Sequence, residues 1–550
     1  MLKSISLKFG SNGRTNSLSF DLTPVTIFVG PNNSGKSLAL KDVERYLQMG
    51  KNEHGNIVSE IVTELDTNEK LMTKIKELDI ELETDGQIDY GLFSVSGSYV
   101  KNIFHKQLYH DGAVKEHYAF ELFMQYFELR LDGTTRLSLI GNQPTGDLLG
   151  KPINRLMELF KDDDKRLRIR KLIYDAFKLY FIIDITGMTH FRIRLSTKEP
   201  ADKSEEQGVD QRARQFLEEA KSINEFSDGI KAYVGLLIAL IAGNSRFFLV
   251  DEPEAFLHPP LSKKLGKVLS ELISEFDGNL FISTHSSNFL MGCIQSGIPA
   301  NIVRLTYKNN IPTAKLLPSK TLYPLLYNPM LRSTGVLESL FYENVIVTEA
   351  DTDRAFYDEI NHRLVSFEKE KGIESCLFLN ANNLQTVSEI VKPIRDFGIP
   401  AAAIIDIDVL NNGGDAWNKT MKACYVPEIS FESLRRERTN IKNRFEELGF
   451  DMKKGGVSLL TGKDKEACNT LFSTLASYGI FVVPNGELEI WLSYLEVKSN
   501  KHDWLKDIFE RLGSDPSIES YVKPKNDDVW EFIFRIKKWL EDPNRKGMPE

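Results

Sequence analysis

The sequence has few cysteines and no long apolar segment. Its four cysteines form no CxxC pair; they are Cys293, Cys376, Cys424 and Cys468. This spacing argues against a zinc ribbon and a disulfide framework, so any metal is expected to bind oxygen ligands. The longest run without a charged or strongly polar residue, 233–243, is shorter than the roughly 18 to 20 apolar residues that cross a bilayer. We expect no membrane-spanning segment.

The chain also lacks an excess of positive charge. Its 69 lysines and arginines stand against 78 aspartates and glutamates, a net charge of −9. A uniformly basic surface for nucleic acid is thereby excluded, and DNA would have to bind a local patch or a bound metal. The first nine residues, MLKSISLKF, alternate like a strand and lack the apolar core of a secretion signal. We therefore expect a cytoplasmic protein.

A glycine-rich phosphate-binding sequence lies near the N-terminus. Residues 30–37, GPNNSGKS, match G-x-x-x-x-G-K-[ST] and stand between an apolar strand over 24–29 and a helical pattern. In such a loop backbone N–H groups surround the phosphates, the lysine neutralises the β and γ phosphates and the serine binds Mg²⁺. We therefore predict a site for ATP and Mg²⁺ whose nucleotide-binding residues are Asn33, Ser34, Gly35, Lys36 and Ser37.

Two later segments predict the rest of an ATPase site. SRFFLVDEP and NLFISTHSS have the profile of neighbouring buried strands in a mostly parallel sheet, each ending in polar residues. Asp251, at the end of the first, is the expected second ligand of Mg²⁺, and Glu252 is the candidate general base. His285 ends the second strand, where an imidazole could reach the γ-phosphate. The alternative for His285 is a helix-capping role.

A long insertion is expected between these motifs, because about 215 residues separate Lys36 from Asp251. Segments from about 90 to 140 predict an antiparallel meander, and residues 145–185 a helical insertion that could serve dimerisation. We interpret the basic run at 165–171 as a solvated helix face. Gln143 is a candidate glutamine-loop residue. Ser227 and Gly229 open an apolar helix whose start could bind the γ-phosphate held by another subunit.

The C-terminal half predicts a second parallel sheet with an acidic edge. From ENVIVTEAD to YGIFVVPNGELEIW, strand and helix patterns alternate. Glu349 ends a strand, Asp353 enters the next helix, and Asp406 and Asp408 are predicted to share one face of a strand. Four carboxylates gathered there would repel one another unless divalent cations lay between them, and oxygen ligands suit Mg²⁺ or Mn²⁺. These four residues are our predicted metal-binding and catalytic site.

The motifs of the first half resemble a known group of ATPases. GPNNSGKS, FSDG, DEPEAFLHPP and STHSSNFL are similar to ABC-type ATPase heads of the SMC group, and within it to those of the OLD (overcoming lysogenization defect) family. The resemblance implies two heads that enclose two ATP molecules, with Ser227 completing the partner's site. A homodimer or a tetramer is therefore expected. The signature here has one glycine after Asp228, where the family has a pair.

The acidic pattern resembles a Toprim domain, which occurs in topoisomerases, primases and OLD nucleases. There, metals bind phosphate oxygens and activate the nucleophile. The resemblance further implies a second metal site, which Glu487 and Glu489 fit, and a catalytic lysine, for which Lys523 and Lys525 are the nearest candidates. Ordinary carboxylates at a helix start are the alternative for the two glutamates. Alanine follows Glu349 where the family has glycine. This alanine would be strained if the turn needs a positive φ.

We thus predict an α/β chain of three parts. An ABC-type P-loop ATPase head with an antiparallel β lobe and a helical insertion covers 1–335, a Toprim-type parallel sheet 336–500 and a helical segment 501–550. The predicted function is ATP-gated, metal-dependent DNA cleavage in anti-phage defence, as the resemblance to Gabija-type and retron-associated effectors implies. A second protein or a structured RNA–DNA molecule is then an expected partner. Predicted DNA contacts are Arg435, Arg436, Arg438, Lys442 and Arg444, for which a solvated helix face is the alternative.

Three other functions fit the same motifs. In a repair-type ATPase clamp, the second domain would bind DNA or a partner without cutting. A topoisomerase-like enzyme would form a covalent tyrosyl–DNA adduct. A non-enzymatic scaffold would be indifferent to the loss of Lys36.

Overall fold

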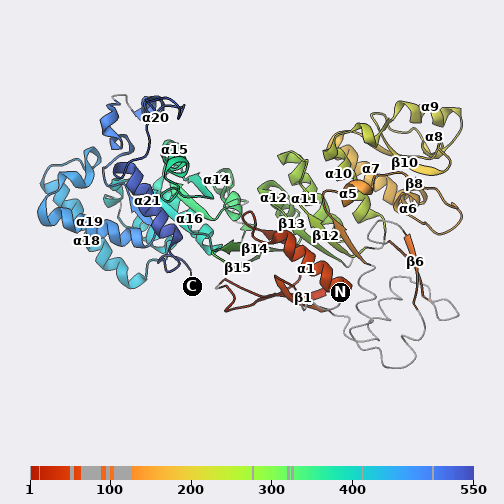
Figure 1. Cartoon of the computed structure of the whole chain (residues 1–550), viewed down its shortest axis with the longest axis horizontal. Helices are drawn as coiled ribbons and strands as arrows, with labels where there is room; N and C mark the ends of the chain where they lie inside the picture. Colours follow the sequence, from red (N-terminus) through yellow and green to blue (C-terminus); the bar gives the residue numbers. More distant parts are fainter. Residues whose placement is uncertain are drawn as a thin grey trace, which may run out of the picture. The chain divides into compact units, whose positions relative to one another are not determined.

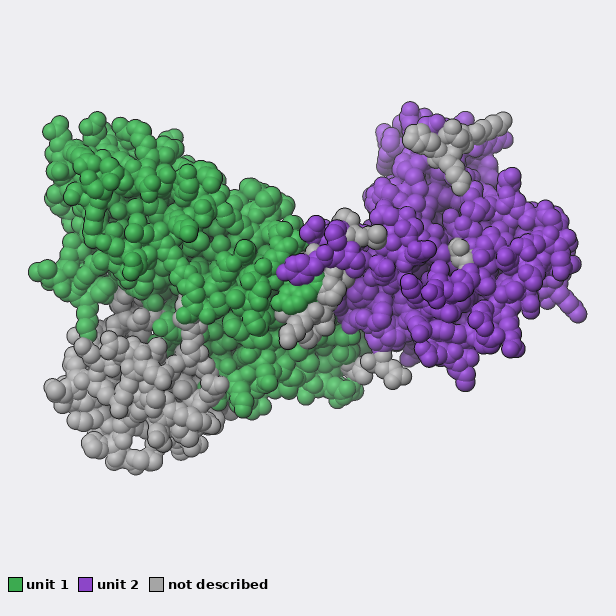
Figure 2. Space-filling view, turned by 180° about the vertical axis from the view of Figure 1, so that it is seen from behind, with its two compact units in different colours: residues 1–323 green, residues 324–550 purple. Residues whose placement is uncertain are grey.

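The protein folds into two compact units, Met1–Tyr323 and Pro324–Glu550, which Figure 2 shows in green and purple. The division lies close to the expected boundary at 335. The computed structural model describes residues 2–11, 13–49, 55–63, 88–93, 99–104, 127–243, 245–275, 278–318, 322–323, 327–411, 413–497 and 501–549.

The centre of the first unit is a six-stranded sheet in the order β15-β14-β3-β13-β12-β7. All neighbours are parallel except β14 and β15, and the predicted parallel pairing of the strands in SRFFLVDEP and NLFISTHSS is confirmed. The strands are β3 (Val25–Val29), β7 (Glu128–Leu131), β12 (Phe247–Asp251), β13 (Asn279–Ser283), β14 (Ala300–Lys308) and β15 (Ile311–Pro318). The side chains of β3, β12 and β13 are almost all buried, as parallel strands covered on both faces require.

Helices and a small lobe cover this sheet (Figure 1). The lobe is an antiparallel sheet of β1 (Leu2–Leu7), β2 (Leu18–Asp21) and β4 (Val58–Thr63), whose Ile5 and Ile61 share a core with Leu40 of α1 (Lys36–Met49) and Phe281 of β13. Helices α11 (Pro259–Ile273) and α12 (Ser287–Gln295) lie side by side, and the apolar helix α10 covers Asp228–Ile241.

The expected antiparallel meander is only partly correct. Strands β5 (Ile88–Phe93) and β6 (Tyr99–Phe104) form an antiparallel pair. Residues 128–131, however, belong to β7, which pairs in parallel with β12 and so joins the main sheet. The sequence of 128–131, ELRL, suits either arrangement, and only the tertiary pairing decides. The predicted segment over 105–126 lies outside the described residues.

The expected helical insertion contains α6 (Arg155–Lys161) and α7 (Asp163–Phe177), each capped by an aspartate or asparagine side chain. Two short elements precede these helices, α5 (Thr135–Ser138) and β8 (Gln143–Pro144). The elements that follow them are β9 (Tyr180–Asp184), β10 (His190–Ser196), α8 (Lys203–Gln207), α9 (Gln211–Glu219) and β11 (Lys221–Ser222).

The basic run on α7 is not simply a solvated face, and that interpretation is corrected here. Arg166 and Arg170 are 2% and 7% exposed, and both guanidinium groups contact the buried carboxylate of Glu206. The two arginines are four residues apart and so share the helix face that packs on β9. Other members of the run are Lys165, which pairs with Glu158, and Arg168, which pairs with Glu275.

The second unit is built on a parallel sheet in the order β17-β16-β18-β19. The strands are β16 (Asn344–Thr348), β17 (Cys376–Asn380), β18 (Ala401–Ile405) and β19 (Ile480–Val482). The helices are α14 (Pro329–Ser333), α15 (Asp351–Phe367), α16 (Leu384–Asp396), α17 (Asp415–Ala423), α18 (Phe431–Glu447), α19 (Gly462–Ser477), α20 (Lys501–Leu512) and α21 (Asp528–Glu541).

The C-terminal helices belong to the core of this second unit. Trp504 of α20 and Trp530 of α21 are buried in one cluster with Ile346 of β16 and Phe481 of β19. Residues after 500 therefore complete the unit instead of forming a separate appendage. Among the described residues, no helix is long and apolar enough to cross a membrane.

We predict that Glu206→Ala destabilises the first unit by about 3 to 5 kcal/mol, because it leaves two buried guanidinium groups without their carboxylate. Urea unfolding followed by circular dichroism measures the change. The matched control is Glu219→Ala, which removes an exposed ion pair with Lys198 and should cost less than about 1 kcal/mol. Equal losses in the two variants would contradict a buried, coupled Arg166–Glu206–Arg170 group.

Candidate functional site

The predicted phosphate loop lies between β3 and α1. Gly30 and Gly35 have φ angles of +144° and +94°, which L side chains rarely adopt. A Cβ atom on Gly30 would lie 2.0 Å from the carbonyl oxygen of Leu305, and one on Gly35 would lie 2.6 Å from the Ile57 side chain. The local backbone therefore requires glycine at both motif positions. Asn33 also has positive φ, at 59°.

Lys36 is folded back over this loop. Its side chain is 4% exposed, and its ammonium donates to the carbonyl oxygens of Gly30 at 2.9 Å and Pro31 at 2.7 Å. The group lies 3.4 Å from the Ser34 hydroxyl. Burial lowers the pKa of Lys36 to about 8, while the nearby Glu252 carboxylate opposes that change. Phosphate oxygens would replace the carbonyl acceptors and favour the charged form.

The two expected Mg²⁺ ligands are in direct contact. Ser37 Oγ donates to Asp251 Oδ1 at 2.9 Å, and the Ser283 hydroxyl donates to the same carboxylate oxygen. The helix that follows the phosphate loop and the end of β12 thus meet at one point. This is the arrangement that holds Mg²⁺ in P-loop ATPases, where a serine and an aspartate share the ion with the nucleotide. The donor set therefore fits Mg²⁺.

Glu252 and His285 lie next to each other beside this point. Glu252 is half exposed, and its Oε1 lies 3.4 Å from His285 Nε2. Burial, and then the charge of Lys36, lower the pKa of His285, so a neutral imidazole is favoured. Glu252 has a left-handed φ of 48°, and its N–H donates to the carbonyl of Ser283. The carboxylate is thus placed to orient or deprotonate water.

Glu254 is a residue of this site that the sequence did not single out. It is buried, which raises its pKa, and its Oε1 accepts from the Thr284 hydroxyl at 2.7 Å and from the His285 N–H at 2.9 Å. It therefore fixes the His285 turn. The repeated glutamate in DEPE was an available signal, but nothing in that string tells a structural glutamate from a catalytic one.

The other predicted nucleotide contacts lie on α10 and in the insertion. Ser227 is exposed at the start of α10 and makes no side-chain cap, so its hydroxyl is open to an external ligand. Gly229 is buried, and a Cβ there would lie 2.6 Å from the carbonyl oxygen of Phe256. The Gln143 amide donates to the Leu139 carbonyl and accepts from the Leu156 N–H, contacts that hold the insertion together.

The second unit brings two of the four predicted acids together at one sheet edge. β16 and β18 are parallel neighbours, so Glu349 and Asp406, which follow them, leave the sheet side by side. The Asp406 N–H donates to Glu349 Oε1 at 2.9 Å. The expectation that Asp406 and Asp408 share a strand is corrected. Strand β18 ends at Ile405, Asp406 follows it directly, and Asp408 lies in the 3-10 turn Ile407–Leu410.

These acids are electrostatically strained. Burial raises the pKa of Glu349 to about 8, with further repulsion from Asp406, Asp408 and Asp353. Burial likewise raises the pKa of Asp406 to about 7, with Asp353 as the next cause. A neighbouring cation would favour the charged forms. The four predicted ligands therefore act as one electrostatic cluster.

Asp353 and Ala350 form the turn between β16 and α15. Asp353 Oδ2 accepts from the Ala350 N–H at 3.2 Å, which fixes the first turn of the helix. Ala350 has φ −126° and ψ 165°, an extended conformation that any residue adopts. Alanine in place of the family's glycine therefore causes no backbone strain here.

Lys453 contributes positive charge to this cluster, although no sequence motif pointed to it. Its Nζ lies 2.9 Å from Asp408 Oδ2 and 3.7 Å from Glu487 Oε1. Glu489 lies half-buried in the 3-10 turn that follows Glu487. The two lysines expected to be catalytic contact aromatic rings instead. Lys523 lies 5.6 Å from the ring centre of Phe367, and Lys525 lies 3.8 Å from that of Tyr494.

The cluster suits a divalent metal in its chemistry but not yet in its geometry. All of its donors are carboxylate oxygens, and their raised pKa values reflect a shortage of positive charge. Over the part of the chain that is described, however, no three acidic, histidine or cysteine side chains are arranged to hold an ion as they stand. The side chains, Lys453 among them, would have to move for an ion to bind.

The expected DNA-binding stretch lies on α18, and one member is corrected. Arg438 is 7% exposed, donates to the Leu410 carbonyl at 3.0 Å and lies over the ring of Trp417. It thus supports the turn that carries Asp408 and cannot contact DNA from the surface. The others have acidic partners: Arg435 and Arg436 with Glu432, Lys442 with Glu446, and Arg444 with Asp464.

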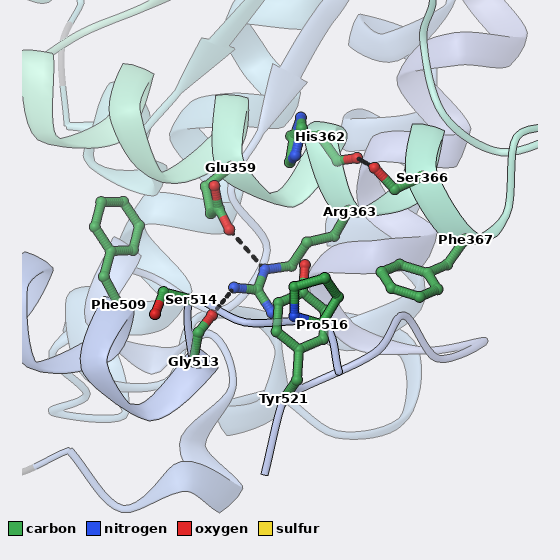
Figure 3. Close-up of a pocket in the computed structure, with 10 residues that line it drawn as sticks. All are labelled: Glu359, His362, Arg363, Ser366, Phe367, Phe509, Gly513, Ser514, Pro516 and Tyr521. Atoms are coloured by element: carbon green, nitrogen blue, oxygen red, sulfur yellow. Dashed lines mark hydrogen bonds and ion pairs between the residues drawn. The ribbon is translucent and has the colours of Figure 1, made fainter. Parts of the chain in front are cut away.

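A pocket of about 370 Å³ opens on the second unit between α15, the end of α20 and residues 513–521 (Figure 3). Arg363 crosses it, but its guanidinium donates to Glu359 and to the carbonyl oxygens of Leu512, Gly513 and Val522. Tyr521 lies over the same group at 4.0 Å. The arginine therefore joins α15 to the C-terminal segment, and the pocket is separate from the acidic cluster.

Comparison with known protein families finds a match within the first unit. Residues 25–291 match the family model described as "AAA domain, putative AbiEii toxin, Type IV TA system". No curated protein matches the chain.

Solved structures give weaker likenesses. The SMC head bound to the C-winged helix domain of ScpA has a TM-score of 0.35 and 11% identity, over 58% of this chain and 98% of that one. The SMC head domain from Thermotoga maritima has a TM-score of 0.30 and 15% identity, over 57% of this chain and 98% of that one. A nucleotide-free ATP-binding cassette from an ABC transporter has a TM-score of 0.25 and 14% identity, over 60% of this chain and 98% of that one. Scores this low do not define the fold, which rests on the family match and the sheet itself.

The family match, the phosphate loop and the Ser37–Asp251 contact together indicate that the first unit contains a P-loop ATPase domain. ATP, with Mg²⁺, is its expected ligand.

We predict that Glu252→Gln retains ATP binding and lowers the rate of hydrolysis by about 10² to 10⁴, the usual contribution of a general base. Fluorescent nucleotide titration and phosphate release measure the two properties. Lys36→Met, which removes the phosphate-binding cation, should instead lose nucleotide binding itself. Normal hydrolysis by Glu252→Gln would reject the role assigned to that carboxylate.

Proposed function

We propose that this chain is an ATP-gated, divalent-metal-dependent DNA endonuclease of the OLD type. The observation that supports it best is the Asp406 N–H to Glu349 contact, which brings acids 57 residues apart to one edge of a parallel sheet. Residues 336–500 would then form a Toprim nuclease domain with the C-terminal helices packed on it. Glu349, Asp353, Asp406 and Asp408 would hold Mg²⁺ or Mn²⁺, and Glu487 extends the set.

When bound, the metal would supply a Lewis acid for the phosphate and lower the pKa of an attacking water. The residues of the chain have their own tasks. The carboxylates of Glu349 and Asp406 would hold the metal at one sheet edge, where the Asp406 N–H donates to Glu349 Oε1. Burial raises the pKa of both groups, and a bound cation would favour their charged forms. Lys453 lies 2.9 Å from Asp408 and could stabilise charge on a phosphate. We propose it as a catalytic lysine beside the two candidates predicted from the sequence, Lys523 and Lys525.

The ATPase domain would act as a switch through dimer closure. Ser227 is exposed at the start of a 14-residue helix and could meet the nucleotide of a partner head. A ligand shifts a conformational equilibrium only by its different affinity for the two states, and ATP held between two heads has that property. We propose a cytoplasmic homodimer or tetramer that acts on DNA in anti-phage defence, with a second protein or an RNA–DNA molecule as partner.

One observation favours a second candidate, an ATPase clamp whose C-terminal unit binds DNA or a partner without cutting. Lys453 already neutralises part of the acidic cluster, and the described residues contain no ready three-ligand metal site. A lysine in that place could hold the acids permanently and make a metal unnecessary. The two candidates differ in whether DNA is cut in the presence of Mn²⁺.

We predict that the purified protein nicks or linearises plasmid DNA with Mn²⁺, and that Asp406→Asn lowers the rate at least about 10²-fold while ATP hydrolysis continues. The matched control is Asp515→Asn, an exposed acid of the same unit that only caps Ser517. Cleavage by Asp406→Asn at the wild-type rate would reject the acidic cluster as the active site. ATP hydrolysis without cleavage under any nucleotide condition would favour the clamp.

We predict a different result for Lys453→Met, which removes the ammonium next to Asp408. Mn²⁺ should bind more tightly to this variant, because the competing cation is gone, while cleavage at saturating Mn²⁺ should fall about tenfold or more. Isothermal titration and the plasmid assay separate the two effects. Lys523→Met serves as the control, since Lys523 lies against Phe367. Should Lys523→Met alone abolish cleavage, the catalytic lysine is the one predicted from the sequence.

A further inference from the structure

A buried arginine stands behind the catalytic turn of the ATPase domain. Arg136 is 1% exposed and belongs to the short helix α5, which follows β7. β7 is the parallel neighbour of β12, so the arginine is delivered next to the acidic end of that strand. Asp132 fixes the entry to α5 by accepting from the N–H groups of Thr134 and Thr135.

The turn in front of it is held in an unfavourable conformation. Glu252 and Phe256 have φ angles of 48° and 70°, and this left-handed geometry is unfavourable for an L-residue. Such a conformation persists only where surrounding groups impose it. Arg136 Nη1 donates to the Glu252 carbonyl at 2.9 Å, and the guanidinium lies 5.9 Å from the ring centre of Phe256. One side chain thus contacts both strained positions.

The arginine is costly to keep in this place. Burial lowers its pKa, while the charges of Glu254, Asp132 and Glu252 oppose that change. Within the described residues, its Nε finds no hydrogen-bond partner. A buried cation with an unsatisfied donor is a poor source of stability. Its specific contribution is therefore the placement of the Glu252 turn.

The backbone of Arg136, as distinct from its guanidinium group, is in contact with α10, the helix that begins after Ser227. A Cβ on Gly235 would lie 2.1 Å from the Arg136 carbonyl oxygen, so helix and arginine backbone touch. Near the start of the helix, a Cβ on Gly229 would lie 2.6 Å from the Phe256 carbonyl oxygen. The helix therefore contacts both the arginine and the far end of the catalytic turn.

We propose that Arg136 is a positioning residue for ATP hydrolysis, which holds Glu252 in its catalytic conformation and links that conformation to α10. Because it is buried, it acts through Glu252 and not on the nucleotide. A displacement of α10, as when Ser227 meets the nucleotide of a second subunit, would reach the catalytic glutamate along this contact. The inference rests on the ATPase and dimer parts of the proposed function and is independent of DNA cleavage.

The test is Arg136→Met, with ATP hydrolysis and fluorescent nucleotide binding measured on the full chain without DNA. We expect kcat to fall on the order of 10- to 100-fold, with the nucleotide Kd changed less than about threefold, since Lys36 and Ser37 are untouched. Arg136→Lys, which keeps a cation but loses the planar donor geometry, should recover part of the rate.

Arg155→Met is the matched control. Arg155 is also fully buried, and its Nε donates to the Ala242 carbonyl at 3.1 Å, just beyond the opposite end of α10. The control should lose stability but keep its kcat at a temperature where it is folded. Gly235→Ala disturbs the contact between α10 and the Arg136 backbone by a change on the helix. It should lower kcat while nucleotide affinity is retained.

Three results would overturn the proposal. They are a wild-type kcat in Arg136→Met, an equal loss of kcat in Arg155→Met, and a joint fall of kcat and nucleotide affinity in Arg136→Met. Since the readout is ATP hydrolysis, an absence of nuclease activity leaves the test intact. If Arg136→Met does not fold, Gly235→Ala decides: an unchanged kcat in that variant removes the link to α10.

Discussion

Both candidate sites depend on one constraint, the burial of parallel strands on two faces. Such strands can place polar side chains only beyond their ends. The carboxyl ends of β3, β12 and β13 deliver the phosphate loop, Asp251 and the His285 turn to one edge of the first sheet. β16 and β18 do the same for Glu349 and Asp406 in the second sheet. The polar residues of both candidate sites therefore lie at the carboxyl ends of buried apolar strands.

The two edges differ in how their negative charge is balanced. In the ATPase domain, Lys36 lies among Glu252, Asp251 and Glu254, and the hydroxyls of Ser37 and Ser283 donate to Asp251, so the proposed Mg²⁺ ligand already has hydrogen-bond partners. In the second unit the acids outnumber their cation, and the pKa values of Glu349 and Asp406 rise to about 8 and about 7. An excess of buried negative charge favours added cations, which is the physical basis for proposing a metal there.

The sequence predicted what is local and periodic. Apolar runs ending in Asp251, Glu349 and Asp406 sufficed to place those residues at sheet edges, and the glycine spacing defined the phosphate loop. It failed where long-range packing decides. Lys453 comes from an ordinary DMKKGG string, and only tertiary structure brings it to Asp408. Arg166 looked solvated because its partner, Glu206, lies forty residues away on another helix.

Charged residues on helices were the commonest source of error for a related reason. A basic run predicts a solvated face only if every member faces water, whereas a helix turns one residue in three or four towards its neighbours. Arg438 and Arg170 occupy such inward positions, each against a buried acceptor. The same geometry makes them informative, because a desolvated guanidinium must be held by specific partners. Arg438 holds the turn of Asp408 as Arg136 holds that of Glu252, so in each unit a buried arginine fixes the backbone that presents an acid.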